Sequence, residues 1–94
     1  METLKDKIEC LTRDAIEGLD LDNESTYEFE FTHDDHLYFV EGHCYTQEYR
    51  HYTYLTGIEF TVYKENKEIE EDEVFELPKE DVESIEYEVV SWFK

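Results

Sequence analysis

The chain has little positive charge: eight Lys and Arg residues stand against 27 Asp and Glu residues, and the formal net charge is −19. Phosphate backbones and anionic bilayers are bound through many cations, so direct binding to nucleic acid or to a membrane is not expected. The excess of carboxylates instead predicts a basic protein as the partner, because complementary charge speeds and strengthens association.

Long apolar segments are missing as well. No run of residues approaches the roughly 20 that a membrane-spanning helix requires. Charges also interrupt the first ten residues, where a secretion signal would be apolar, so the sequence predicts a cytoplasmic protein. With 94 residues, the chain is expected to fold as a single domain over residues 1–94 with one two-layer core.

Only two cysteines are present. Cys10 is expected on the side of a helix away from its apolar stripe, and Cys44 on the core face of a strand. Because the predicted compartment is reducing, two unpaired thiols are favoured over a disulfide.

Aromatic residues are concentrated in the stretch 26–63, which holds eleven of the fifteen and no proline. This density of aromatic and β-branched residues predicts three antiparallel strands. A turn at Asp34-Asp35 pairs residues whose numbers sum to 69, so that Phe29 lies opposite Val40. The predicted core face consists of Tyr27, Phe29, Phe31, Tyr38, Val40, Ile58, Phe60 and Val62.

The third strand is expected after a turn placed in residues 47–51, which have no glycine or proline signature. Its even-numbered residues carry the core side chains, and Tyr52 and Tyr54 share that parity. Residues 64–67 predict another tight turn, and a short fourth strand is expected over residues 68–70.

Residues 4–17 are predicted to form a helix, because their apolar residues fall within about 80° of arc at 100° per residue. Thr3 is the expected N-cap, with Asp6 as the carboxylate of a capping box, and Gly18 is the expected end. The apolar stripe consists of Leu4, Ile8, Leu11, Ala15 and Leu19.

A second helix is favoured after Pro78, a residue suited to the first turn of a helix. The alternative is a strand, because Ile85, Tyr87 and Val89 alternate with polar residues. The helical stripe consists of Val82, Ile85, Val89, Trp92 and Phe93. The predicted fold is therefore a two-layer α+β domain in which an N-terminal and a C-terminal helix pack on the same face of an antiparallel sheet of three or four strands.

The other face of this sheet is expected to stay open, with Leu37 and Leu55 partly exposed on it. Phe39, Tyr45 and Tyr63 are the candidate contacts for a partner or for a second copy of the chain, because interfaces are enriched in Tyr and Phe. Single exposed aromatic residues are also ordinary on small domains, and this interpretation stays open.

The C-terminal third is the most acidic part, with twelve acidic and two basic residues between Glu65 and Glu88. Charge runs are usually the solvated side of a helix. The functional alternative is an array of carboxylates that imitates nucleic-acid phosphates and occupies the binding groove of a basic protein. Its candidate residues are Glu80, Glu83, Glu86 and Glu88. Calcium binding is a weaker alternative, because no EF-hand spacing is present.

The stretch His33-Asp34-Asp35-His36 is the candidate metal site. A hairpin tip can direct His33, Asp35 and His36 at one cation, but zinc sites need three or four ligands and this spacing is weakly specific. A solvated turn is the favoured interpretation, and no cofactor is expected.

Catalysis has little support in the sequence. His43 and Cys44 are neighbours on a strand, so their side chains point to opposite faces and cannot share a proton. Glu28 and Glu41 face each other in the predicted register and are a candidate carboxylate pair. Without a nucleophile or a glycine-rich phosphate loop, we do not expect an enzyme.

The segment TYEFEFTHDDHLYFVEGHCY, followed by a Tyr-rich strand, resembles small uncharacterised acidic proteins carried by mobile elements of gut bacteria. The resemblance covers the strand region and brings no catalytic residues. It implies a context in which small acidic proteins inhibit the DNA-binding systems of the host.

The leading hypothesis is a non-enzymatic acidic interaction protein that acts as a nucleic-acid mimic towards a basic DNA- or RNA-binding partner. The alternative is a small homo-oligomeric or accessory structural protein that uses the aromatic sheet face. A metal-responsive domain that uses the hairpin tip is the third hypothesis.

Overall fold

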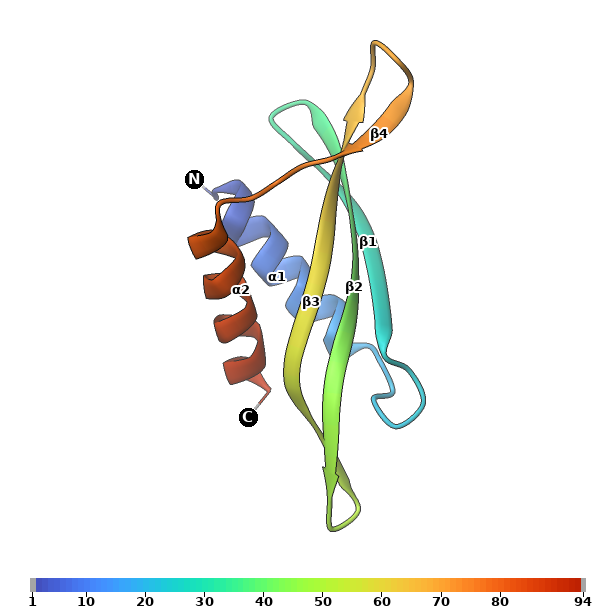
Figure 1. Ribbon diagram of the computed structural model, residues 1–94, viewed down its shortest axis with the longest axis vertical. Coiled ribbons are helices and arrows are strands. Elements are labelled where there is room, and N and C mark those ends of the chain that lie inside the picture. Colours follow the sequence, from blue (N-terminus) through green and yellow to red (C-terminus); the bar gives the residue numbers. More distant parts are fainter. Residues whose placement is uncertain (1, 94) are drawn as a thin grey trace.

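The computed structural model describes residues 2–93, and it has the predicted α+β architecture (Figure 1). The four strands form an antiparallel meander in the order β1-β2-β3-β4, and both helices pack on one face of this sheet. Along the chain the elements are α1 (Leu4–Glu17), β1 (Thr26–His33), β2 (His36–Tyr49), β3 (Tyr52–Asn66), β4 (Glu71–Val74) and α2 (Lys79–Trp92).

Helix α1 has the predicted bounds and caps. The Thr3 hydroxyl accepts a hydrogen bond from Asp6 N over 3.1 Å, and Gly18 N donates to Asp14 O over 3.3 Å at the other end. The buried stripe is rotated relative to the prediction, because the fully buried residues are Ile8, Thr12 and Ile16 while Leu4, Leu11, Ala15 and Leu19 are only partly buried.

The rotation of α1 buries Thr12 completely, and its Oγ1 has no hydrogen-bond partner among residues 2–93. An unsatisfied buried hydroxyl costs about 1–3 kcal/mol of stability. We find no compensating contact for this group.

Helix α2 follows Pro78, as predicted, and the alternative of a C-terminal strand is wrong. The carbonyl of Pro78 accepts hydrogen bonds from Asp81 N and Val82 N over 2.9 and 3.1 Å. Ile85 and Val89 are buried, whereas Trp92 is 57% exposed and lies under the Arg13 guanidinium, 4.2 Å from its ring centroid.

The hairpin of β1 and β2 has the predicted register, including Phe29 opposite Val40 and Tyr27 opposite Gly42. Its turn is Asp34-Asp35, with φ angles of 51° and 64°. Left-handed conformations at both central residues match the twist of a two-residue hairpin, and Asp tolerates them better than most residues.

Gly42 leaves space for the ring of Tyr27 on the opposite strand. A Cβ atom at this position would lie 2.2 Å from Tyr27 Cζ and 2.7 Å from the carbonyl oxygen of Glu59. The Tyr27 hydroxyl donates to that same carbonyl over 3.2 Å, so the ring spans from β1 across β2 to β3. This bond and the packing of the ring both require glycine at position 42.

A β-bulge interrupts the pairing of β2 with β3. Tyr45 lies opposite Gly57, but the next residue, Thr46, lies opposite Leu55, so Thr56 is an extra residue on β3. An extra residue reverses which side chains point to each face beyond it. Leu55 is therefore 2% exposed and part of the core, whereas Tyr54 is 43% exposed on the other face.

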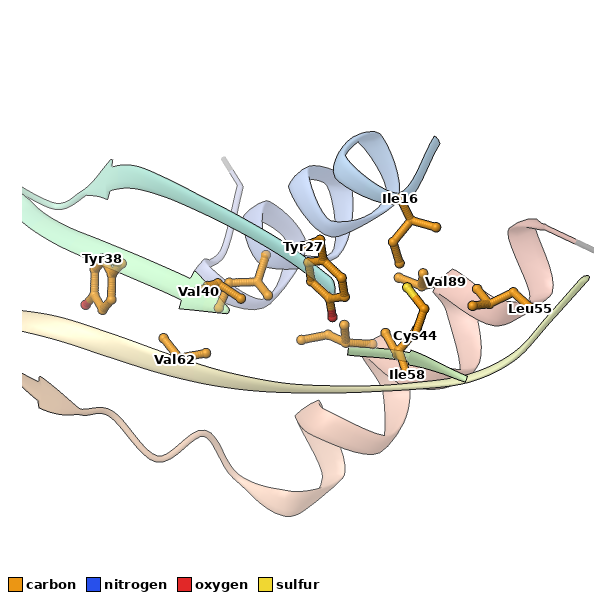
Figure 2. Close-up of a cluster of buried hydrophobic side chains, with 11 residues drawn as sticks. Ile16, Tyr27, Tyr38, Val40, Cys44, Leu55, Ile58, Val62 and Val89 are labelled. Atoms are coloured by element: carbon orange, nitrogen blue, oxygen red, sulfur yellow. The ribbon is translucent and has the colours of Figure 1, made fainter. Parts of the chain in front are cut away.

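The bulge corrects two predictions at once. Leu55 was expected on the open face, and Tyr52 and Tyr54 were expected to share the core parity; both expectations are wrong. Figure 2 shows Leu55 beside Val89 and Cys44 within the core.

Of the two remaining turns, the first lies within its predicted range and the second comes later than predicted. The turn between β2 and β3 is Arg50-His51, with φ angles of 50° and 73°. Strand β3 runs through residues 64–66, where a turn was expected, and the fourth strand comes later than predicted, over Glu71–Val74.

The core lies between the helices and the sheet. Five of the eight predicted core residues of the sheet are buried, and Phe29, Phe31 and Phe60 pack against them while partly exposed. The buried hydrophobic residues are Ile8, Ile16, Tyr27, Tyr38, Val40, Cys44, Leu55, Ile58, Val62, Ile85 and Val89. Cys10 and Cys44 are free, and burial raises the pKa of the Cys44 thiol to about 11.

Replacing Gly42 by Ala should lower the free energy of unfolding by about 1–3 kcal/mol or more, because the new methyl group collides with the Tyr27 ring and with backbone. Gly57→Ala is the matched control, since its Cβ would meet Tyr45 at an ordinary 3.8 Å. That variant should be neutral or more stable by up to roughly 1 kcal/mol. Urea denaturation measures both, and equal losses would contradict the assigned packing of Tyr27.

Replacing Leu55 by Ala should cost about 2–5 kcal/mol of stability, as expected for a buried leucine. Tyr54→Ala, one residue away on the other face, should cost no more than about 1 kcal/mol. Thermal and denaturant unfolding of the two variants compare these losses. The reverse order would show that β3 continues without a bulge.

Candidate interaction surface

The face of the sheet opposite the helices is uncovered, and we call it the open face (Figure 1). The pairing of the strands places its side chains in cross-strand rows. Its aromatic residues are Phe39, Tyr45, Tyr49, Tyr52, Tyr54 and Tyr63. Within residues 2–93, its paired positions also carry carboxylates and no lysine or arginine; the acidic residues are Glu28, Glu30, Glu41, Glu59, Glu65 and Asp72.

The first group of contacts on the open face lies over the centre of the sheet. Phe39 and Tyr63 are opposite each other, with ring centroids 6.1 Å apart. The Tyr63 hydroxyl donates to Glu41 Oε1 over 2.9 Å, and this hydrogen bond is the main reason that the pKa of Tyr63 is raised. The carboxylate thus holds the aromatic ring in one position.

The second group lies next to it along β2 and β3. The ring of Tyr45 meets the His43 imidazole edge to face, with centroids 5.0 Å apart. A hydrogen bond with Glu59 raises the pKa of the Tyr45 hydroxyl. Two of the three predicted aromatic contacts, Tyr45 and Tyr63, are therefore bonded to a glutamate of the neighbouring strand.

The open face continues onto a two-stranded extension, residues 45–56, which we call the hairpin arm. Strand β1 begins at Thr26, opposite His43, and Cys44 N still donates to Ser25 O, so β2 and β3 pair only with each other beyond Cys44. In Figure 1 the arm projects past the ends of both helices. A hydrogen bond between the Thr53 hydroxyl and the Asp22 carboxylate joins the arm to the connection before β1.

The arm presents three tyrosines that the sequence did not assign to this face. Tyr49 and Tyr52 are cross-strand neighbours, 61% and 76% exposed, and the Tyr54 hydroxyl donates to Gln47 Oε1 over 2.9 Å. The bulge is the reason that Tyr52 and Tyr54 were missed, whereas Tyr49 fell in the turn expected over residues 47–51. Gly57 was the available signal, because an isolated glycine inside a strand pattern often marks a bulge.

A hollow of about 880 Å³ lies around Gly42, and its lining also includes Ala15 and Leu19 of the helix side. Glu28, Glu41, His43 and Glu59 border it on the open face. Glu28 and Glu41 face each other as predicted, whereas Cys44 next to His43 is buried on the opposite side. The hollow is thus lined by anionic and imidazole groups that a cationic group of a partner could approach.

The four glutamates predicted on α2 do not form one array. Glu80 and Glu88 are exposed, Glu83 is exposed with its carboxylate 3.9 Å from Lys79 Nζ, and Glu86 is half-buried beside β3. At 100° per residue, Glu83 and Glu88 point about 140° apart around the helix. A single flat surface can therefore contact only some of them.

The hairpin tip holds the residues of the metal alternative. His33 and His36 are paired across the turn, and His33 Nε2 lies 3.4 Å from Asp34 Oδ2, while Asp35 and His36 are exposed. In the part of the chain that the structure describes, no group of three or more His, Cys, Asp or Glu side chains could hold a metal ion. The third ligand that zinc requires has no candidate here.

No protein-family model, curated protein sequence or solved structure matches this chain. Neither helix within residues 2–93 is both long enough and apolar enough to cross a bilayer. The resemblance to acidic proteins of mobile elements stays a prediction. Arguments about function therefore depend on the geometry and charge of the surfaces described above.

Replacing Glu86 by Gln tests the electrostatics beside α2. Burial, Glu83 and Glu59, in that order, raise the pKa of Glu86. A raised pKa means that the folded chain binds the proton more tightly than the unfolded chain, so the ionised carboxylate opposes folding at neutral pH. The variant should melt at a higher temperature than the parent at pH 7, and this gain should disappear below the ordinary carboxyl pKa of 4.5.

The control for this experiment is Glu80→Gln, which removes the same charge from an exposed position of the same helix. Its gain should be smaller, because it reports only the relief of general repulsion. Equal gains for the two variants, or a gain for the Glu86 variant that persists at acid pH, would contradict the assignment.

Proposed function

We propose that this protein is a non-enzymatic binding module whose open face docks onto a basic surface of a nucleic-acid-binding protein. The observation that carries the proposal is the pairing of aromatic rings with carboxylates on a sheet face that neither helix covers and that has no lysine or arginine at its paired positions within residues 2–93. The aromatic rings and the carboxylates of this face would each contribute differently to binding such a partner.

The aromatic residues would supply most of the contact energy. Tyr and Phe are enriched in the centres of interfaces and among the residues that dominate binding energy. Here Tyr45, Tyr54 and Tyr63 are held by hydrogen bonds to neighbouring side chains. Since these rings are already ordered, little side-chain entropy is lost when a partner covers them.

The carboxylates would select a partner with arginine and lysine. A guanidinium forms paired hydrogen bonds with a carboxylate and also stacks on tyrosine rings, and both groups alternate along this face. With a net charge of −19, the whole chain attracts such a partner at long range. Binding should therefore be fast at low salt and weaker as salt rises.

The same surface argues against direct binding to nucleic acid. Open antiparallel sheets with exposed rings can stack bases, but they do so beside cations that neutralise the phosphates. At the paired positions of this face the charged groups are carboxylates, which repel phosphates, and one guanidinium, that of Arg50, lies over the Tyr49 ring at the tip of the arm. Instead, the flat rings and the carboxylate oxygens of this face resemble the bases and the phosphates of a nucleic acid strand. This resemblance supports a nucleic-acid mimic on the open face rather than on α2.

The alternative of a homo-oligomer through this face is less favoured by the charges. Two copies placed face to face would bring carboxylates such as Glu28, Glu41 and Glu59 together without any lysine or arginine from the paired positions to separate them. A second chain of this sequence is thus a poor partner for the open face.

The proposal is tested by binding to the basic proteins retained from a lysate of the native host, each then purified and measured singly. A variant with Glu28, Glu41 and Glu59 changed to Gln, and another with Tyr45 and Tyr54 changed to Ser, should each weaken binding at least about tenfold. Single-stranded or duplex DNA should compete with the protein, and added salt should slow association.

The matched control changes Glu80, Glu83 and Glu88 to Gln, which removes the same number of charges from α2. This variant should keep most of its affinity. The proposal would be contradicted if both open-face variants bound the partner with unchanged affinity, or if only the α2 variant lost affinity for it. A dimer that persists at micromolar concentration and dissociates with the Tyr→Ser changes would favour the homo-oligomer.

A further inference from the structure

The outer edge of β3 is only partly covered. Strand β4 pairs with Tyr63–Asn66, and Phe75 N donates to Val62 O over 2.8 Å. Alternate residues of an antiparallel strand direct their backbone groups to opposite sides. The backbone groups of Ile58 and Phe60 therefore point away from β2, as those of Val62 do, and within residues 2–93 they have no hydrogen-bond partner.

Helix α2 runs beside this edge and leaves a groove between them. A hollow of about 330 Å³ lies between Ile58 on β3 and Glu83, Glu86 and Val90 on α2. A second, separate hollow of about 250 Å³ lies further along the edge, between Phe60, β4 and the start of α2. We call these two hollows together the edge groove.

The edge groove is anionic. Glu83 and Glu86 line it, and Glu86 is half-buried, with its pKa raised by burial and then by the charges of Glu83 and Glu59. Lys79 Nζ lies 3.9 Å from Glu83 Oε1, and both of these side chains are largely exposed. An exposed pair of this kind contributes little, so the carboxylates of the groove are not neutralised from within.

The other edge of the sheet is treated differently. The ammonium group of Lys7, on α1, donates to the carbonyl of Thr32, on β1, over 2.9 Å. A lysine at an edge strand protects it from pairing with another chain. The exposed part of β3, Thr56–Phe60, contains no lysine or proline. Edge-to-edge pairing of two copies is opposed there by the carboxylates of α2, which would face each other.

We propose that the edge groove binds an extended peptide segment bearing lysine or arginine, which adds as a strand to β3 at Ile58 and Phe60. The segment would exchange backbone hydrogen bonds with these two residues, as in other domains where a peptide lies between an edge strand and a helix. Its side chains on the helix side would contact Val90, and its cations would meet Glu83 and Glu86. This site is separate from the open face and does not depend on the proposed function.

The probe is a capped synthetic heptapeptide, Lys-Thr-Val-Thr-Lys-Thr-Val, which places lysine and valine in turn on one face of the added strand. It is added to the full chain labelled with ¹⁵N. At saturation, the amide hydrogens of Ile58 and Phe60 should exchange at least about tenfold more slowly, because they gain hydrogen-bond partners. The decisive comparison is the same peptide with N-methyl groups on every backbone amide, which blocks both of its strand edges. It keeps the charge but cannot pair with the strand, so its affinity should fall at least about tenfold.

The protein variants locate the site. Changing Glu83 and Glu86 to Gln should lower the affinity for the peptide by about tenfold. Changing Glu28 and Glu41 to Gln on the open face should alter this affinity little. Equal affinity for the N-methylated peptide, or unchanged exchange at Ile58 and Phe60 in the saturated complex, would overturn the proposal. So would the absence of binding at millimolar peptide. None of these results depends on whether the open face binds a basic protein.

Discussion

The pairing of β2 with β3 is the constraint on which the rest of the structure depends. β1 adds to the outside of β2, and β4 and Phe75 add to the outside of β3. The bulge at Thr56 lies within this pairing and reverses the faces beyond it, so that Leu55 reaches the core and Tyr54 does not. One extra residue thus extends both the hydrophobic core and the aromatic open face towards the arm.

A chain of this length has two helices to cover one sheet, and both lie on the same face. The uncovered face is tolerated because its rings are interleaved with carboxylates and bonded to them, as Tyr63 is to Glu41. The same acidic groups that keep this face solvated would select a partner rich in arginine and lysine. At the edge of β3, Glu83 and Glu86 extend this preference to the groove beside α2. Solubility and recognition would then have the same physical origin, an excess of negative charge beside ordered apolar surface.

Local signals in the sequence were sufficient for the elements and for the first hairpin. The alternation of Phe29 and Phe31 with glutamates, together with the Asp34-Asp35 turn, led to the observed register, and Thr3 and Gly18 marked the ends of α1. What could not be predicted depends on contacts between distant segments. The rotation that buries Thr12 is set by the packing of α1 on the sheet and on α2, and no periodicity within α1 reports it. The bulge depends on how β2 and β3 fit together, for which the isolated Gly57 was the only local sign. Because the faces beyond it were reversed, Tyr52 and Tyr54 were missed, and Tyr49 was missed because it was placed in a turn. The candidate surface was therefore predicted only in its central part, around Phe39, Tyr45 and Tyr63.

The central claim is that one face of the sheet is buried under the helices while the other is open. At the bulge, the residues of β3 that point to the core change from even-numbered to odd-numbered. Hydroxyl-radical footprinting of the free protein, read by mass spectrometry at single residues, tests this most directly. Tyr52 and Tyr54 should be oxidised rapidly, whereas Leu55, between the bulge and these tyrosines, should be protected as strongly as Val40 and Val62. Rapid oxidation of Leu55 together with protection of Tyr54 would contradict the account, because it would place the tyrosines of the arm on the core side of the sheet.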